Sequence, residues 1–274
     1  MLHRVAIWVM VSFLCSAIIR FVLMLDLNKR VYNHTPGPCR VVNGITDGAA
    51  GLEFVGEASV VFISTGLANA YGNESSDTGI SIIQLQKEMA KHEATSIKIE
   101  GVNFGKSSFG ALYFFDGRHV SLLESRLSTP SALAIDRRRK LIFVGSLLNE
   151  NIRVYALEKD YSITFRTQIS LLSSPAGMHI EDETGDIWVA LHPVLHQVFL
   201  VTMYPGDEKV RSSSQVLRVR MQEDGVSWVI TEPYANDGAT ISASNAVIYD
   251  KDHLLVGSMF GRLLHCDVLN PSIT

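Results

Sequence analysis

The feature that most constrains the fold is a unit of two apolar runs joined by a polar turn, which occurs three times in this sequence. The copies differ in their turns but share the order of the runs, with the second run more apolar than the first. The first copy is Ser131–Asp136 with Leu141–Ser146, and the third is Ser244–Asp250 with Leu254–Ser258. The middle copy includes Asp182–Pro193, in which an acidic turn leads into an apolar run. A continuous apolar run of this length between turn residues is typical of a buried strand. One antiparallel supersecondary unit is therefore repeated along the chain.

Each copy is followed by a further alternating run, which we expect to be a strand. These runs are Ile152–Leu157, Val198–Thr202 and Leu263–Val268. Several four-stranded units of about 40 to 50 residues are the sequence pattern of a β-propeller. The sequence therefore predicts an all-β propeller.

Weaker strand patterns fill the rest of the chain. They are Leu52–Val55 with Ser59–Ser64, then Ile80–Leu85, Ile97–Ile99, Ala111–Phe115 with Val120–Leu123, Val216–Arg220 and Val226–Ile230. Asp116-Gly117 between two apolar runs is a two-residue hairpin signal. Only Gln84–Glu93 has a pattern that allows a short helix.

The composition describes a packed globular chain without affinity for nucleic acid. Hydrophobic residues make up 47% and charged residues 19% of the sequence, and the formal net charge is −4. Nonspecific binding to phosphates requires a basic surface. The basic run Arg137–Lys140 falls in an expected hairpin turn, so we interpret it as a solvated tip.

The N-terminal segment Val5–Leu25 is apolar except for two serines and Arg20, and it is long enough to span a bilayer as a helix. We expect residues 1–25 to be a retained transmembrane signal-anchor, 26–38 a tether and 39–274 the propeller. The alternative is a signal peptide cleaved after Ala17. Both place the propeller on the lumenal or extracellular side, in the endoplasmic reticulum or at the cell surface.

Cysteines and glycosylation sequons agree with that compartment. Cys15 lies in the apolar segment, so Cys39 and Cys266 remain, enough for one disulfide and too few for a metal site. Asn33 and Asn73 begin acceptor sequons, which predicts a glycoprotein.

Several segments resemble the paraoxonase (arylesterase) family. They are Pro38–Ile45, Val61–Leu67, Glu183–Val189 with His192-Pro193, and Leu254–Phe260. The resemblance implies a six-bladed propeller with an uncleaved N-terminal segment and a disulfide between Cys39 and Cys266. It also implies a catalytic and a structural calcium ion in the central tunnel and hydrolysis of lactones and aryl esters.

The chain departs from this family in two ways. The family's calcium-ligand positions correspond here to Ala50, Gly51, Ser131, Ala176 and Gly177, none of which supplies a carboxylate. We therefore expect no cofactor, with calcium as the alternative if the ligands are misaligned. The chain also passes directly from Phe109 to Ala111, where the family has the stretch that carries its histidine dyad. Nearly two blades would then be absent, as in a shortened isoform or an incomplete gene model.

No other residue forms a convincing catalytic set. His192 ends a central strand but has no carboxylate partner in the pattern, so it is a weak catalytic candidate, and His196 would add a second metal ligand only. The acidic residues Asp182, Glu183 and Asp186 fit a hairpin turn better than a calcium loop. Asn245 and Asp237 are further polar candidates.

Within this family, the chain most resembles nematode paraoxonase-like membrane proteins that help degenerin-type sodium channels fold and assemble. The chain keeps the apolar anchor, the cysteine pair and the repeated strands of the family but lacks its calcium ligands. This combination favours a noncatalytic, chaperone-like protein that associates with the membrane and with such channel subunits. The alternative is a calcium-dependent arylesterase or lactonase, and a third interpretation is a nonfunctional splice product.

Overall fold

The computed structural model of the chain describes residues 2–45, 48–55, 60–65, 79–84, 95–98, 109–115, 120–205, 207 and 209–270. Two sequence predictions fall elsewhere. The possible helix at Gln84–Glu93 lies, beyond Gln84, outside the described residues, and so does the sequon residue Asn73.

Antiparallel sheets make up most of the described chain. The first sheet contains β2 (Gly51–Val55), β3 (Val60–Thr65), β4 (Gly79–Gln84) and β5 (Thr95–Lys98). A two-stranded sheet contains β6 (Phe109–Phe115) and β7 (Val120–Ser128). The next contains β8 (Pro130–Asp136), β9 (Leu141–Ser146), β10 (Asn151–Leu157) and β11 (Ile163–Ser170). It is followed by β12 (Ser174–Ile180), β13 (Ile187–His192), β14 (Ser214–Met221) and β15 (Trp228–Asn236). The last contains β16 (Ser244–Asp250), β17 (His253–Ser258), β18 (Leu263–Asp267) and, from the start of the chain, β1 (Cys39–Val41).

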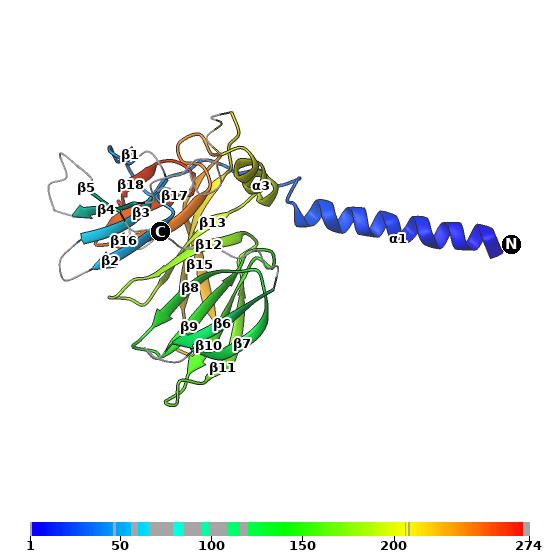
Figure 1. The fold of residues 1–274 in the computed structure, drawn as a ribbon, viewed down its shortest axis with the longest axis horizontal. Coiled ribbons are helices and arrows are strands. Elements are labelled where there is room, and N and C mark those ends of the chain that lie inside the picture. Colours follow the sequence, from blue (N-terminus) through cyan, green and yellow to red (C-terminus); the bar gives the residue numbers. More distant parts are fainter. Residues whose placement is uncertain are drawn as a thin grey trace.

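The innermost strands of the four-stranded sheets are β2, β8, β12 and β16. β8 contacts β12, β12 contacts β16, and β16 contacts β2, so four neighbouring sheets meet along their inner edges (Figure 1). This arrangement confirms the predicted propeller. In the described residues it consists of four complete blades and the β6–β7 hairpin.

The core fills the spaces between neighbouring blades. Phe143 of β9 packs with Val189 of β13, and Trp188 of β13 packs with Val256 of β17, in two separate clusters. β9, β13 and β17 are buried along nearly their whole length, because a blade covers each of their faces. This explains why their sequences are continuous apolar runs, whereas alternation marks half-exposed strands.

The chain start closes the last blade. β1 pairs with β18 in a register that sets Cys39 directly opposite Cys266, and the two form a disulfide. The segment ahead of β1 is not a free tether, because His34 and Ala235 exchange two backbone hydrogen bonds and Leu269 N–H donates to the Pro36 carbonyl. β1 thereby covers the edge of β18, which would otherwise be unpaired.

Two helices are described. α1 (Leu2–Met24) extends away from the propeller, and within it Arg4–Leu23 is long and apolar enough to cross a membrane (Figure 1). α3 (Leu195–Met203) follows β13 and lies at the base of α1. The expectation of a strand at Val198–Thr202 was wrong, because this run belongs to α3. Its buried side chains, Leu195, Val198 and Val201, recur every three residues, a helical spacing that outweighs the β-branched composition.

Candidate functional site

The positions that correspond to the family's calcium ligands lie at one end of the innermost strands. Gly51 begins β2, Ser131 is near the start of β8, and Ala176 and Gly177 lie near the start of β12. Asn245 occupies the corresponding place in β16. The structure thus brings the five family positions and Asn245 to the same rim of the propeller.

Hydrogen bonds at this rim join neighbouring blades. Asn245 Nδ2 donates to the Ala50 carbonyl at 2.5 Å, and Ser131 Oγ donates to the Pro175 carbonyl at 2.6 Å. A Cβ added at Gly177 would lie 2.2 Å from the Asn245 carbonyl oxygen. Backbone from β16 therefore occupies the space that a larger side chain at Gly177 would need.

Calcium requires six to eight oxygen ligands, of which carboxylates are the usual source. The described residues at this rim offer no carboxylate at the five family positions. Ser131 offers a single hydroxyl, which donates a hydrogen bond to the Pro175 carbonyl, and only main chain is present at Gly177. The residues at these positions do not fit a calcium ion.

His192 is enclosed at the end of β13 without a described hydrogen-bond partner at Nδ1. The residue is 1% exposed, and burial lowers the pKa of its imidazole to about 4. A neutral ring with so little proton affinity is a poor general base at neutral pH. The geometry assigns His192 to the packed scaffold.

The acidic run between β12 and β13 is a hairpin turn, as expected. Gly185, with φ 75°, supplies the left-handed residue, and its N–H donates to the Glu181 carbonyl. The Asp186 carboxylate turns inward, where it accepts hydrogen bonds from Arg218 at 2.7 Å and Arg220 at 2.8 Å. Asp186 is therefore engaged in a buried ion pair.

Next to that turn lies a polar cavity of about 380 Å³. Its lining includes Glu181, Asp182 and Glu183 from the turn and Asp250 from the end of β16. Burial, together with the negative charges of Glu183 and Asp182, raises the pKa of Asp250 despite the opposing effect of Lys251. This cavity opens at the opposite end of the inner strands from the rim described above.

The other polar candidates belong to loops and helix junctions. Asp237 N–H donates to Asn33 Oδ1 at 2.7 Å, so Asp237 lies beside an exposed sequon residue. His196 does not join His192, because its Nδ1 lies 2.9 Å from the Leu25 carbonyl oxygen. Both sets of contacts connect the segment after α1 to the blade formed by β12–β15.

The junction between α1 and α3 is built from several polar contacts. His196 N–H also donates to the Leu25 carbonyl, and Leu195 N–H donates to Asp26 Oδ2 at 3.3 Å. The buried Asp26 carboxylate pairs with Lys29 Nζ at 2.7 Å, and that ammonium reaches Glu150 Oε1 at 2.8 Å. The segment that directly follows the apolar helix is therefore bound to two blades of the propeller.

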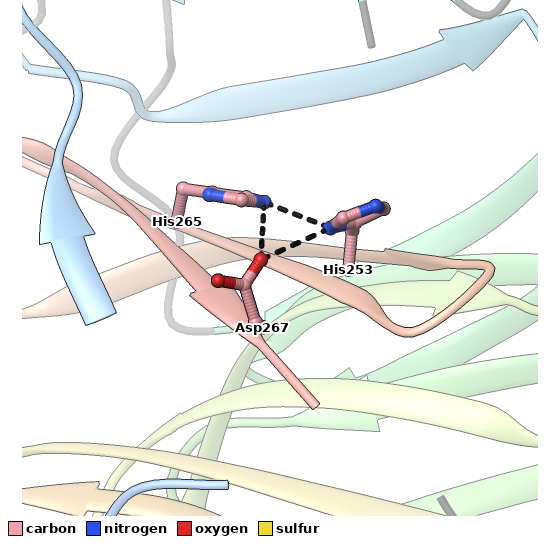
Figure 2. A group of neighbouring side chains, drawn as sticks. All are labelled: His253, His265 and Asp267. Atoms are coloured by element: carbon pink, nitrogen blue, oxygen red, sulfur yellow. Dashed lines mark hydrogen bonds and ion pairs between the residues drawn. The ribbon is translucent and has the colours of Figure 1, made fainter. Parts of the chain in front are cut away.

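A second group of polar side chains lies on the closing blade. His253, His265 and Asp267 direct two ring nitrogens and one carboxylate oxygen toward one another (Figure 2). His265 Nε2 lies 3.2 Å from His253 Nδ1, and Asp267 Oδ1 lies 3.4 Å from the same Nδ1. Within the residues that the structure describes, no other group of three histidine, cysteine or acidic side chains converges in this way.

Comparison with known proteins identifies the family. A family model described as Arylesterase matches residues 104–268, more than half of the chain. The chain belongs to the arylesterase family. Mechanosensory abnormality protein 6 of Caenorhabditis elegans is 32% identical over 368 aligned positions, which cover 100% of this chain and 97% of that protein. Since this arylesterase-family chain has 274 residues, many of those positions have no counterpart in it.

Other relatives match a smaller region. Serum paraoxonase/arylesterase 2 of Rattus norvegicus is 27% identical over 157 residues, which are 57% of this chain and 42% of that protein. Among solved structures, a luciferin-regenerating enzyme covers 85% of this chain with a TM-score of 0.50 and 12% sequence identity. At this sequence identity the likeness shows only that the two chains share a fold.

Sequence reasoning missed the group on the closing blade. His253 was assigned to a turn, and His265 and Asp267 were part of an alternating run that was used only to recognise a strand. The signal was present, because residues two apart in a strand share a face. Nothing in the sequence alone placed His253 opposite that face.

Proposed function

We propose that this arylesterase-family chain is a membrane-anchored protein that helps membrane channel subunits fold and assemble, and that it does not catalyse calcium-dependent ester hydrolysis. The observation that carries the proposal is the junction of hydrogen bonds and ion pairs between the end of the apolar helix and the propeller. His196 and Leu195 of α3 bond to Leu25 and Asp26, which directly follow α1, and Lys29 links this segment to Glu150. A propeller held in this way stays at a fixed height above the bilayer.

The exposed side of α3 supports the same placement. Phe199, Leu200 and Met203 are large apolar side chains in solvent, and Leu27 adds another beside the end of α1. An apolar helix face next to a membrane span is suited to the bilayer interface or to a neighbouring transmembrane protein. A channel subunit folding in the same membrane is a partner of this chemistry.

The rim of the propeller supports the noncatalytic part of the proposal. The family positions hold Ala50, Gly51, Ser131, Ala176 and Gly177, and the buried His192 has a pKa near 4. The disulfide and the exposed sequon at Asn33 favour the lumenal or extracellular side, in the endoplasmic reticulum or at the cell surface.

Coexpression with degenerin-type sodium channel subunits tests this function. We expect the wild-type chain to raise the amount of channel at the cell surface, measured by surface biotinylation. Met203→Glu places a charge on the exposed side of α3 and should reduce that gain. The matched control Val226→Glu changes an exposed apolar residue in the turn between β14 and β15 and should retain it. Surface channel that does not respond to the wild-type chain would overturn the proposal.

Family membership favours one alternative, a calcium-dependent arylesterase or lactonase. Purified full-length protein in detergent micelles can be assayed with an aryl ester and a lactone, with calcium and with a chelator. Turnover that calcium supports and the chelator abolishes would establish this alternative and contradict the absence of hydrolysis.

A further inference from the structure

We propose that His253, His265 and Asp267 form a binding site for a divalent transition-metal ion, and that Zn²⁺ fits their ligand atoms. This site is separate from the rim discussed above, because it lies on β17 and β18 rather than on the innermost strands. The proposal does not depend on the function proposed for the chain.

The register of the closing blade creates the site. His253 begins β17 and pairs directly with Asp267 of β18, so their side chains share one face of the sheet. His265 is two residues before Asp267 and joins that face, whereas the intervening Cys266 packs in the core beside Cys39. Figure 2 shows the two rings and the carboxylate approaching one another from the two strands.

The separations of the ligand atoms are close to the edge lengths of a metal-centred tetrahedron, within a few tenths of an ångström. Zinc–nitrogen and zinc–oxygen distances of about 2.0–2.2 Å place neighbouring tetrahedral ligands about 3.3–3.6 Å apart. The three separations here are 3.2 Å between the ring nitrogens, 3.4 Å from His253 Nδ1 to Asp267 Oδ1, and 3.9 Å from His265 Nε2 to the same oxygen. An ion can therefore contact all three atoms after side-chain shifts of a few tenths of an ångström.

The donor types select the ion. Two imidazole nitrogens and one carboxylate oxygen suit zinc and neighbouring transition metals, whereas calcium and magnesium prefer sites made of oxygen. With three protein ligands, a tetrahedral ion would keep its fourth position for water or an external group.

Burial is graded across the site. The His265 side chain is fully buried, whereas the side chains of His253 and Asp267 are 33% and 37% exposed. The buried ring fixes one ligand and the two partly exposed groups leave a path for an ion to enter. Arg40 pairs opposite His265 in β1, but its side chain is exposed, so water weakens its repulsion of the ion.

A bound ion would reinforce the blade that closes the propeller. His253 belongs to β17, and His265 and Asp267 flank Cys266, whose disulfide joins β18 to β1. An ion shared between β17 and β18 would cross-link β17 to β18, which the disulfide already joins to β1. The ion-bound protein should therefore resist thermal unfolding better than the ion-free protein.

Calorimetric titration of the full-length protein in detergent micelles with ZnCl₂ tests the site, after a chelator has been removed by dialysis. We expect one ion per chain and a higher melting temperature with zinc. His253→Ala and Asp267→Asn alter the two partly exposed ligands, so the buried His265 stays in place and the fold is retained. Each should weaken zinc binding by more than about tenfold, since loss of even an outer-sphere partner costs about 10- to 100-fold.

The control is His34→Ala, which removes an exposed histidine outside the site. It should bind zinc and gain thermal stability as the wild type does. Absence of saturable zinc binding in the wild type, equal affinity in Asp267→Asn, or tighter binding of Ca²⁺ than of Zn²⁺ would overturn the proposal. None of these outcomes bears on channel assembly, so the two proposals fail separately.

Discussion

Replacing Asp186 by asparagine should be among the most damaging single changes in the propeller, although asparagine has the same shape. The Asp186 side chain is 3% exposed and the Arg218 side chain 7% exposed, so the ion pair between them is withdrawn from water. Breaking a buried pair by removing one partner costs about 3–5 kcal/mol, because the remaining charge is left without its counter-ion. Arg218 also lies 3.8 Å from Glu181 Oε2 and over the Trp188 ring. These contacts offset part of the cost, and we expect Asp186→Asn to lower the free energy of unfolding by about 3 kcal/mol.

The second arginine provides an internal control. Arg220 also binds Asp186, but its side chain is 51% exposed, and half-exposed ion pairs contribute about 0–1 kcal/mol. Arg220→Met should therefore cost less than about 1 kcal/mol. The double change Asp186→Leu with Arg218→Met removes both buried charges and should be less damaging than Asp186→Asn alone.

Urea unfolding of the full-length protein in micelles, followed by tryptophan fluorescence, measures these differences. Trp188 is fully buried and lies beside Arg218, so it reports on this region. The reasoning would be refuted if Asp186→Asn cost less than about 1 kcal/mol, or if Arg220→Met were as damaging as Asp186→Asn.

Three other changes follow from the structure. The pKa of His192 is about 4 in the fold and near 6.5 in an unfolded chain, so the unfolded state binds more protons between these values and stability should fall as the pH drops from 6.5 to 4. His192→Gln should reduce that slope by up to about 1.4 kcal/mol per pH unit, and urea titrations at pH 7 and pH 5 that show the same slope for both proteins would contradict this. Gly177→Asp should destabilise the propeller by about 1–3 kcal/mol rather than create a calcium site, because the Cβ meets the Asn245 carbonyl, and a melting temperature raised by calcium would show the opposite. His196→Ala removes the ring contact with Leu25 and should accelerate proteolysis of residues 26–38 in micelles, whereas an unchanged cleavage rate would show that the ring does not hold the junction.

The repeated units predicted the blades well because their signal is local. Leu141–Ser146 became β9 with the same bounds, and Ile152–Leu157 lies within β10. Strands of this kind are buried by neighbouring copies of themselves, so the apolar run needs no information from distant sequence. The Cys39–Cys266 disulfide also has a general cause, since the edge of the last blade must be joined to the start of the chain.

The elements that were missed depend on contacts between distant segments. Val198–Thr202 has a strand-forming composition, but the run is helical in α3, whose first N–H groups meet Asp26 and Leu25 across the fold. The face shared by His265 and Asp267 was readable from the alternation of β18, yet its third member reaches it only through the pairing of β17 with β18. Both cases require the register or the tertiary partner, which periodicity does not contain.

The distribution of polar groups supports a division of labour within the fold. At the rim, Ser131 and Asn245 hydrogen bond to backbone of the next blade, so polar side chains there join blades instead of facing a ligand. Polar side chains with converging ligand atoms occur instead on the closing blade, and exposed apolar side chains collect on α3 beside the apolar helix α1. A family member organised in this way keeps the propeller as a rigid platform and carries its interactions at the periphery. This arrangement supports the role proposed above, because a protein that holds or orients another protein uses its surfaces rather than a central tunnel.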